Sequence, residues 1–402
     1  MDNWCDMAQT ELVFENNGLL AHSPQTHVFI IGVGHYRYGK GGSEPVTPDG
    51  DYIGQLTSPP VSARALADWF IRDFNNAARP LGSVALLLSE QAVASTYTPP
   101  QTALVPAPQA YRVPVADHAQ VTAAALAWIE RLKHNKDNMA VFYFCGHGMT
   151  WNSNTTMLLR DFGQDSNNPI AEAIAVDQVV ETMKNCPAIY QAFFIDCCRT
   201  RQDDLLEGQA VIGTPAFFLT PRARQHADVR RQAVYYATSD DRPAAGGKNR
   251  TSLFTEALMD GLSLVAAENE TGNWVVRTGR LVDAMTRLVG LKLKSAGGTI
   301  QIPAPKWMHS FDFNSTQMPP GVRTYVTAKD TSKWGDLHLR CVRPSDNMEL
   351  VNEPTDANND PFAQWELPLA QDLIIEAKLS GGATVTHRLS TGHPVRWVEL
   401  GV

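Results

Sequence analysis

The apolar positions of residues 26–310 follow two alternating patterns. Short, mostly apolar runs rich in β-branched and aromatic residues predict buried parallel strands, and these runs are 26–34, 82–88, 138–145, 190–196 and 233–238. Apolar positions at helical spacing predict the helices between them, at 61–74, 117–134, 174–186, 252–265 and 278–293. Strands that alternate with helices predict an α/β fold with a mostly parallel sheet flanked by helices on both faces.

Changes in this pattern predict the domain organisation. Residues 1–25 are expected to form an N-terminal extension, and residues 26–310 the α/β domain. Within that domain, residues 201–231 break the alternation and predict a mobile insertion. From 319 to 402, short segments alternate apolar and polar positions, which predicts a small C-terminal β-sandwich domain.

Composition narrows the function classes. The net charge of -8 over 402 residues argues against nucleic acid as a partner, because nucleic-acid binders carry a clustered basic face. The acidic start of the chain lacks the pattern of a signal peptide, and no long apolar run predicts a membrane span, so a cytoplasmic protein is expected. Six irregularly spaced cysteines predict reduced thiols rather than a disulfide framework.

Two segments carry the candidate chemistry. His147 stands in AVFYFCGHGM, two residues past one predicted strand, and Cys198 stands in FFIDCCRT, two residues past the next. Parallel sheets place functional groups beyond the carboxyl ends of their strands, so the two residues are expected at the same edge. A thiolate activated by a neighbouring imidazole is a nucleophile, and the imidazole returns a proton to the leaving group.

The order and spacing of these motifs resemble those of the caspase and metacaspase superfamily of cysteine peptidases, over about residues 26–305. The resemblance implies that Cys198 is the nucleophile, that His147 is its acid/base partner, and that the amides of Gly148 and Cys198 form the oxyanion hole. No third catalytic member is evident. Cys197 is the competing nucleophile, and alternation along the strand allows only one of the pair to face His147.

In this family the residue two before the nucleophile influences the choice of the P1 residue, on the amino side of the cleaved bond. That residue is Asp196. It implies a basic P1, with Arg favoured by bidentate contact, and Ser239 and Asp240 are further candidates for this pocket. Relatives with basic specificity often carry a second acid where residues 61–64 read VSAR. Two alternatives stay open: Asp196 orders its own loop, or P1 is aspartate.

The resemblance also suggests regulation and setting. The insertion carries four candidate processing sites, and these are Arg222, Arg224, Arg230 and Arg231. Cleavage there by the enzyme itself or by an upstream protease would activate a zymogen, so an activating protease or an inhibitor is an expected partner besides protein substrates. No cofactor is expected, and Asp203 and Asp204 are candidates for recruiting calcium, as some relatives do. The implied setting is bacterial signalling, stress response or defence.

Two other interpretations of the same residues remain. A catalytically idle scaffold would keep the fold and bind partners without cleaving them. A zinc site would use the sulfur and imidazole ligands of Cys145, His147, Cys197 and Cys198, although adjacent cysteines of one strand point apart and the usual paired spacings are missing.

Overall fold

The computed structural model divides into two compact units, Met1–Met259 with Gln301–Phe311 and Asp260–Ile300 with Asp312–Val402. The residues that the structure describes are 9–47, 49–91, 94–151, 154–168, 170–198, 217, 219, 230–238, 248–269, 273–296, 303–316, 321–356, 361–392 and 395–402. Within these ranges, no helix is both long and apolar enough to cross a membrane.

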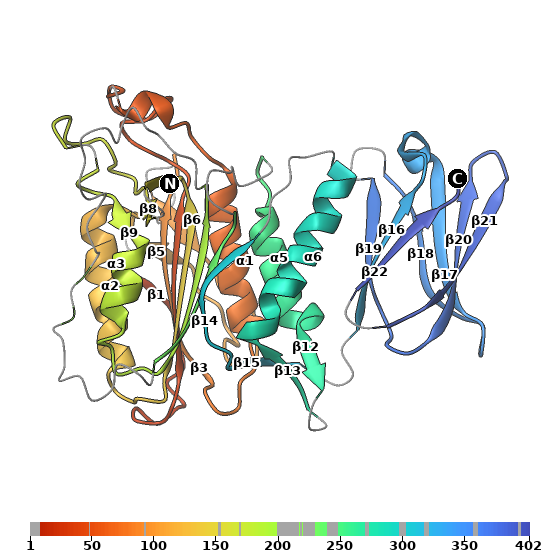
Figure 1. Ribbon diagram of the computed structural model, residues 1–402, viewed down its shortest axis with the longest axis horizontal. Coiled ribbons are helices and arrows are strands. Elements are labelled where there is room, and N and C mark those ends of the chain that lie inside the picture. Colours follow the sequence, from red (N-terminus) through yellow and green to blue (C-terminus); the bar gives the residue numbers. More distant parts are fainter. Residues whose placement is uncertain are drawn as a thin grey trace. The chain divides into compact units, whose positions relative to one another are not determined.

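A seven-stranded sheet forms the centre of the first unit (Figure 1). Its five inner strands are parallel, and the two edge strands run antiparallel to their neighbours. The order across the sheet is β1 (Leu12–Glu15), β3 (Leu81–Ser89), β2 (Thr26–Val33), β6 (Met139–Gly146), β10 (Tyr190–Cys197), β11 (Arg231–Tyr236) and β14 (Ala304–Met308). The predicted α/β fold with a mostly parallel sheet is confirmed.

Helices cover both faces of this sheet (Figure 1). Helices α2 (His118–Leu132) and α3 (Val176–Met183) pack on one face, around a core that includes Phe142 and Phe193. Helices α1 (Ser58–Arg72) and α5 (Leu253–Asp260) lie on the other. Each face takes alternate residues of the strands, so neighbouring side chains near the carboxyl edge point to different layers.

Helix α1 starts where the chemistry of its first turn favours a start. Pro59 and Pro60 occupy its first positions, where a missing N–H is harmless because that group has no helical partner. The helix also packs closely on β2, since a Cβ at Gly32 would lie only 2.8 Å from the Pro59 carbonyl oxygen. These features place the loop of residues 34–57, between β2 and α1, above the carboxyl edge of the sheet.

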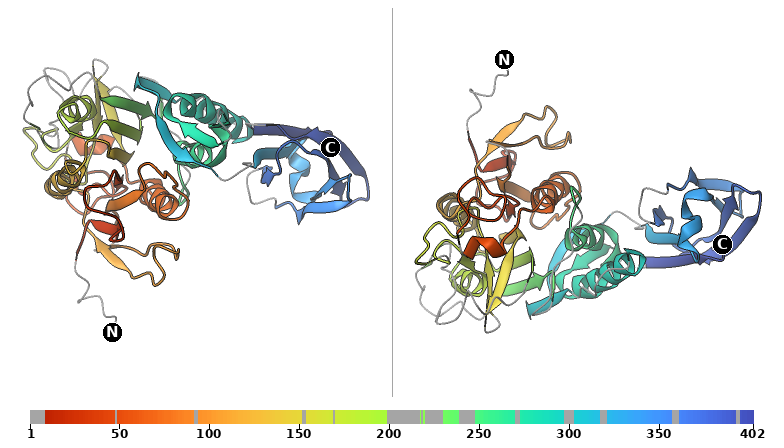
Figure 2. Two further views of the ribbon diagram at one scale, coloured as in Figure 1. Left: turned by 90° about the horizontal axis from the view of Figure 1, so that it is seen from below. Right: turned by 90° about the horizontal axis from the view of Figure 1, so that it is seen from above.

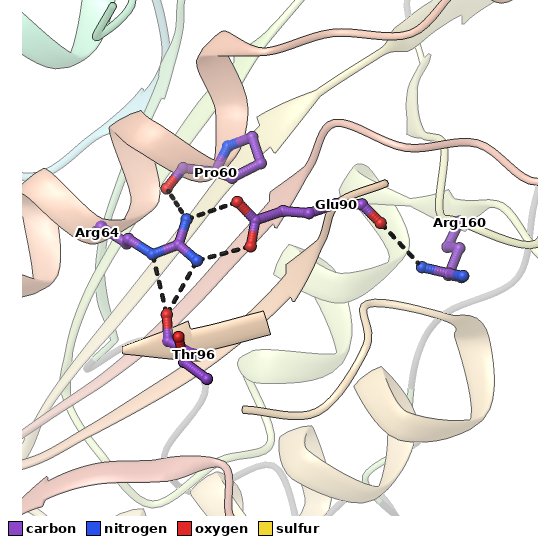
Figure 3. Close-up of polar contacts among 5 residues, drawn as sticks. All are labelled: Pro60, Arg64, Glu90, Thr96 and Arg160. Atoms are coloured by element: carbon purple, nitrogen blue, oxygen red, sulfur yellow. Dashed lines mark hydrogen bonds and ion pairs between the residues drawn. The ribbon is translucent and has the colours of Figure 1, made fainter. Parts of the chain in front are cut away.

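Arg64 of α1 holds a small hairpin of strands β4 (Ser95–Tyr97) and β5 (Tyr111–Val113). Its guanidinium makes two hydrogen bonds to the Glu90 carboxylate, of 2.8 and 2.6 Å, and bonds the Thr96 carbonyl at 2.9 Å (Figure 3). Arg160 donates to the Glu90 carbonyl at 3.4 Å. The basic residue of the VSAR run therefore ties the helix to the hairpin.

Short elements complete the first unit near the carboxyl edge. They are η1 (Asp49–Tyr52) and a three-stranded sheet of β7 (Gly148–Trp151), β8 (Asn154–Met157) and β9 (Ile174–Ala175). Strand β7 begins one residue after His147, so the candidate histidine lies between a strand of the central sheet and a strand of the small one.

The second unit combines a small α/β segment with two β-sheets (Figure 2). Its first part comprises the π-helical turn η3 (Gly261–Val265), β12 (Ala267–Asn269), β13 (Trp274–Arg277), α6 (Thr278–Ala296) and β15 (Asp312–Ser315). One later sheet has the order β19 (Phe362–Leu367), β16 (Val322–Ala328), β22 (Val395–Leu400). The other is β18 (Met348–Pro354), β17 (Leu337–Arg343), β20 (Asp372–Leu379), β21 (Thr384–Ser390), and η4 (Thr331–Asp336) precedes β17. Both later sheets contribute to one hydrophobic core, as in a β-sandwich.

Two predicted boundaries differ from the observed ones. Residues before 26 do more than extend the chain, because β1 pairs with β3 and forms an edge of the central sheet. Residues 260–300 group with the C-terminal sheets rather than with the α/β domain. One reason is an ion pair of 2.8 Å between Asp260 and Arg323, whose side chains are only 12% and 16% exposed.

Candidate active site

The two chemical motifs meet because β6 and β10 are adjacent parallel strands. Their register pairs Asp196 with Cys145 and Cys197 with Gly146. His147 and Cys198 are the next residues of the two strands, so both stand at the same place on the carboxyl edge. In parallel strands, residues in register project to the same side of the sheet. The expected convergence of His147 and Cys198 on one edge is therefore observed.

The two neighbouring cysteines have different environments. Cys197 is 1% exposed and belongs to the hydrophobic core that includes Ile195, on the face covered by α2 and α3. Cys198, one residue past the end of β10, is half-buried. A nucleophile must reach its substrate, and of the two sulfur atoms only that of Cys198 belongs to a residue with appreciable exposure.

Gly148 allows the two motifs to pack closely. A Cβ at this position would lie 2.4 Å from Cys197 Sγ and 2.8 Å from the Cys198 carbonyl oxygen, so no larger residue fits without displacement. The main chains of Gly148 and Cys198 are consequently side by side. This closeness is what an oxyanion hole built from their two amides requires.

His147 is held at two points. Its backbone N–H donates to the Tyr36 hydroxyl at 2.6 Å, and its ring Nε2 lies 2.9 Å from the Gly54 carbonyl oxygen. A carbonyl oxygen only accepts hydrogen bonds, so Nε2 carries the proton and Nδ1 is the basic nitrogen of the neutral ring. Burial lowers the pKa of His147, and the bond to Gly54 partly opposes that shift.

Gly54 and Tyr36 were absent from the sequence-based site. The Gly54 carbonyl orients the imidazole, which is the task of the third member that the sequence did not reveal. A backbone carbonyl exists at every residue and leaves no signature in the sequence. Tyr36 sits in a loop whose glycines predicted only irregular structure.

Asp196 lies below this edge, 3% exposed, on the face covered by α1 and α5. Its Oδ2 accepts hydrogen bonds from four side chains, and these are Ser252 Oγ, Thr255 Oγ1 (2.8 Å), Cys145 Sγ (3.3 Å) and Tyr143 OH (3.4 Å). Burial raises the pKa of Asp196, while the four hydrogen bonds lower it. Ser252 and Thr255 come from the start of α5, about sixty residues further along the chain, and no local motif marked them.

The four residues of the zinc interpretation do not converge. Cys145 Sγ contacts Asp196 on one face of the sheet, whereas Cys197 belongs to the core on the opposite face. A tetrahedral site needs all ligands around one point. Across the described part of the chain, no group of three or more His, Cys, Asp or Glu residues is arranged to hold a metal ion.

Several predicted site residues lie outside the described residues: Ser239, Asp240, Arg222, Arg224, Asp203 and Asp204. Within the predicted insertion, Phe217 is buried in the core and the Leu219 N–H donates to Thr182 Oγ1 at 3.0 Å. Arg230 is half-buried. Arg231 opens strand β11, and its N–H donates to the Ile189 carbonyl at 2.8 Å. A bond inside a paired strand is a poor protease substrate, which disfavours Arg231 as a processing site.

Comparison with known proteins places these features in a family. "Uncharacterized protein y4kE" of Sinorhizobium fredii is 25% identical over 356 residues, covering 83% of this chain and 88% of that protein. The crystal structure of caspase-1 from Spodoptera frugiperda is similar with 13% identity and a TM-score of 0.41, over 74% of this chain and 92% of that one. The structure titled pro-sf-caspase-1 is similar with 12% identity and a TM-score of 0.39, over 74% of this chain and 93% of that one. The family model described as "Caspase domain" matches residues 109–316, more than half of the chain, so the chain belongs to the caspase domain family.

Proposed function

We propose that the chain is a cysteine endopeptidase in which Cys198 is the nucleophile and His147 the acid/base group. One observation carries the proposal: the half-buried Cys198 and the doubly held His147 each directly follow one member of the last paired residues, Cys197 and Gly146, of adjacent parallel strands. Membership of the caspase domain family supports it. The buried neighbour Cys197 then has a packing role.

The arrangement suits acyl transfer through a thioester. The Cys198 thiol gives its proton to Nδ1 of His147, and the resulting thiolate attacks the peptide carbonyl carbon. The amides of Gly148 and Cys198 stabilise the negative charge that forms on the carbonyl oxygen. His147 donates a proton through Nδ1 to the leaving amine as the C–N bond breaks. A water molecule then attacks the thioester, giving a proton to His147, and the C–S bond breaks to release the carboxylic acid and regenerate the thiolate.

Asp196 supports a basic P1 residue. The hydrogen bonds that described residues make to it all reach Oδ2, which leaves Oδ1 for a substrate cation. A positive P1 side chain would offset the burial that raises the pKa of Asp196, whereas an acidic one would add a like charge. Arginine brings more donors than lysine and is the favoured P1. Ser239 and Asp240 remain candidates for the same pocket.

The proposal is tested by measuring cleavage of fluorogenic peptides that carry Arg, Lys, Asp or norleucine at P1, with and without calcium. The proteins compared are the natural chain, Cys198→Ala, and Cys197→Ala as the matched control. We expect cleavage after Arg, weaker cleavage after Lys, loss in Cys198→Ala and retention in Cys197→Ala. Cleavage after Asp would keep the peptidase and refute the role of Asp196. Silence with every peptide, and partner binding that survives Cys198→Ala, would favour the scaffold.

Activation by processing is a separate proposal, and it centres on Arg222, Arg224 and Arg230. Joint replacement of the three by Ala should leave the purified chain uncleaved and reduce the activity that develops on incubation. Full activity of the uncleaved variant would refute a zymogen. A role in bacterial signalling, stress response or defence remains a proposal that follows from this chemistry and its family.

A further inference from the structure

We propose that Gln55 is a positioning residue for His147, because its side-chain amide holds together the two groups that hold the histidine. The inference deepens the proposed peptidase function, since it takes His147 as the acid/base group. It concerns the loop of residues 34–57 rather than strands β6 and β10, which end directly before His147 and Cys198.

The two supports of His147 come from different parts of this loop. Near its start, the Tyr36 hydroxyl accepts the His147 N–H at 2.6 Å and donates to the Val33 carbonyl at 3.2 Å. The Tyr36 and His147 rings are in contact, with centroids 5.0 Å apart. Near the end of the loop, the Gly54 carbonyl meets Nε2 at 2.9 Å. The histidine is oriented only if both parts of the loop keep their relative place.

Gln55 provides that link. Its Oε1 accepts the Tyr36 N–H at 2.8 Å, and its Nε2 donates to the carbonyls of Tyr36 at 3.1 Å and Lys40 at 3.0 Å. Three hydrogen bonds thus join one side chain to the start of the loop, while Gln55 itself directly follows Gly54. The contacts close a circuit from the His147 backbone through Tyr36, Gln55 and Gly54 to the His147 ring.

Such a link matters because regular structure is scarce in this loop. The described elements there are the four-residue turn η1 and an isolated bridge between Lys40 and Gly54. Backbone bonds on either side of Gly54 and Gln55 also join the two parts of the loop, since the Lys40 N–H donates to the Ile53 carbonyl at 2.8 Å and the Leu56 N–H donates to the Gly34 carbonyl at 2.8 Å. The loop therefore keeps attachments that the Gln55 side chain does not provide. Removing the Gln55 amide should therefore shift the Gly54 carbonyl without unfolding the unit.

The expected consequence is chemical as well as geometric. The Gly54 carbonyl accepts the Nε2–H more strongly when the ring is positively charged, so the bond raises the pKa of His147 against the effect of burial. The titratable groups whose charges act on neighbouring Tyr36 are Cys145, Cys197 and Cys198. A substitution of Gln55 alters none of these groups. A shift in the pKa of His147 would therefore report on its contact with the Gly54 carbonyl.

The test compares Gln55→Met, which keeps the length of the side chain and removes its hydrogen bonds, with Gln25→Met. Gln25 uses the same chemistry, donating from Nε2 to the Leu20 carbonyl at 2.9 Å, but precedes β2 at the opposite edge of the sheet. The pKa of His147 is followed by NMR of the imidazole, with its signal assigned by its loss in His147→Asn. Steady-state kinetics supply kcat and KM with an Arg-P1 peptide.

We expect the pKa of His147 to fall in Gln55→Met and to stay unchanged in Gln25→Met. We also expect kcat to fall about tenfold or more with little change in KM, because misplaced catalytic groups slow the chemical step. An unchanged pKa in folded Gln55→Met would overturn the proposal whatever the kinetics show. If that variant does not fold, Gln55→Asn replaces it, because its shorter side chain cannot span the same contacts. The pKa of His147 in Gln55→Asn then decides in the same way. Absence of cleavage by the natural chain, before and after the incubation that allows processing, would count against the peptidase, while the pKa comparison would still decide on Gln55.

Discussion

The Thr255 hydroxyl donates a hydrogen bond of 2.8 Å to Oδ2 of Asp196, and both residues are buried. Thr255 Oγ1 also lies 2.6 Å from the Tyr143 hydroxyl, which itself contacts Asp196. A carboxylate in a low-dielectric interior is costly unless hydrogen bonds satisfy it. Helix α5 therefore supplies a hydrogen bond to the buried carboxyl group of Asp196.

Thr255→Val removes this donor and keeps the shape of the side chain. Because hydrogen bonding lowers the pKa of Asp196, its loss should raise that pKa, so a basic P1 would bind well only at higher pH. A hydrogen bond to a charged group contributes about 1.5 to 3 kcal/mol, which corresponds to at least a tenfold fall in kcat/KM for an Arg-P1 peptide. The fall should appear mainly in KM. Thr122→Val is the control, since the buried Thr122 hydroxyl has no hydrogen-bond partner among the residues that the structure describes. Equal effects of the two variants would contradict the role of Thr255.

Asp196→Asn should change how stability depends on pH. Burial raises the pKa of Asp196 above its ordinary value of 3.8, so the folded state favours the protonated form. This group's contribution to the free energy of unfolding is present at low pH and lost as the pH rises through the raised value. Relative to Asp196→Asn, the natural chain should therefore lose stability as the pH rises above the ordinary value of 3.8. Urea unfolding at several pH values measures the free energy of unfolding of both proteins. A natural chain that gains stability relative to Asp196→Asn as the pH rises would contradict the direction of the pKa shift.

Gly148→Ala should strain the contact between the two motifs. Its methyl group would lie 2.4 Å from Cys197 Sγ, and such overpacking costs about 1 to 3 kcal/mol of stability. Removing the sulfur in a Gly148→Ala, Cys197→Ala double variant should recover part of this loss. Recovery is incomplete because the Cys198 carbonyl oxygen remains at 2.8 Å. A double-mutant cycle, measured by denaturant unfolding, gives the coupling free energy between the two substitutions. Strictly additive losses in the free energy of unfolding would show that the contact is relaxed in solution.

Glu90→Gln should destabilise the first unit at neutral pH and less so in acid. Burial raises the pKa of Glu90, but the hydrogen bonds and charge of Arg64 outweigh it, and the net shift is downward. The stability from this pair is present above the ordinary value of 4.5 and lost as pH falls through the lowered one. We expect a loss of about 1 kcal/mol at neutral pH. Glu349→Gln, at an exposed pair with Arg340, should change little, and a loss at Glu90 that persists in acid would contradict the ionic origin.

The sequence by itself determined the strands and helices of the α/β fold and the two motifs at its carboxyl edge. This was possible because the periods of strand and helix are local properties and because parallel strands share one functional edge. His147 and Cys198 could be identified as candidate site residues because a histidine between two glycines and a pair of cysteines after a strand are distinctive in the sequence.

Only the tertiary structure decided what surrounds these residues. Tyr36 and Gly54 hold His147 from 111 and 93 residues away, and Thr255 reaches Asp196 across 59. Such contacts depend on register and on the paths of loops, which long-range packing sets. Backbone groups such as the Gly54 carbonyl are chemically alike at every residue, so their role emerges only when the folded chain brings one of them to the imidazole.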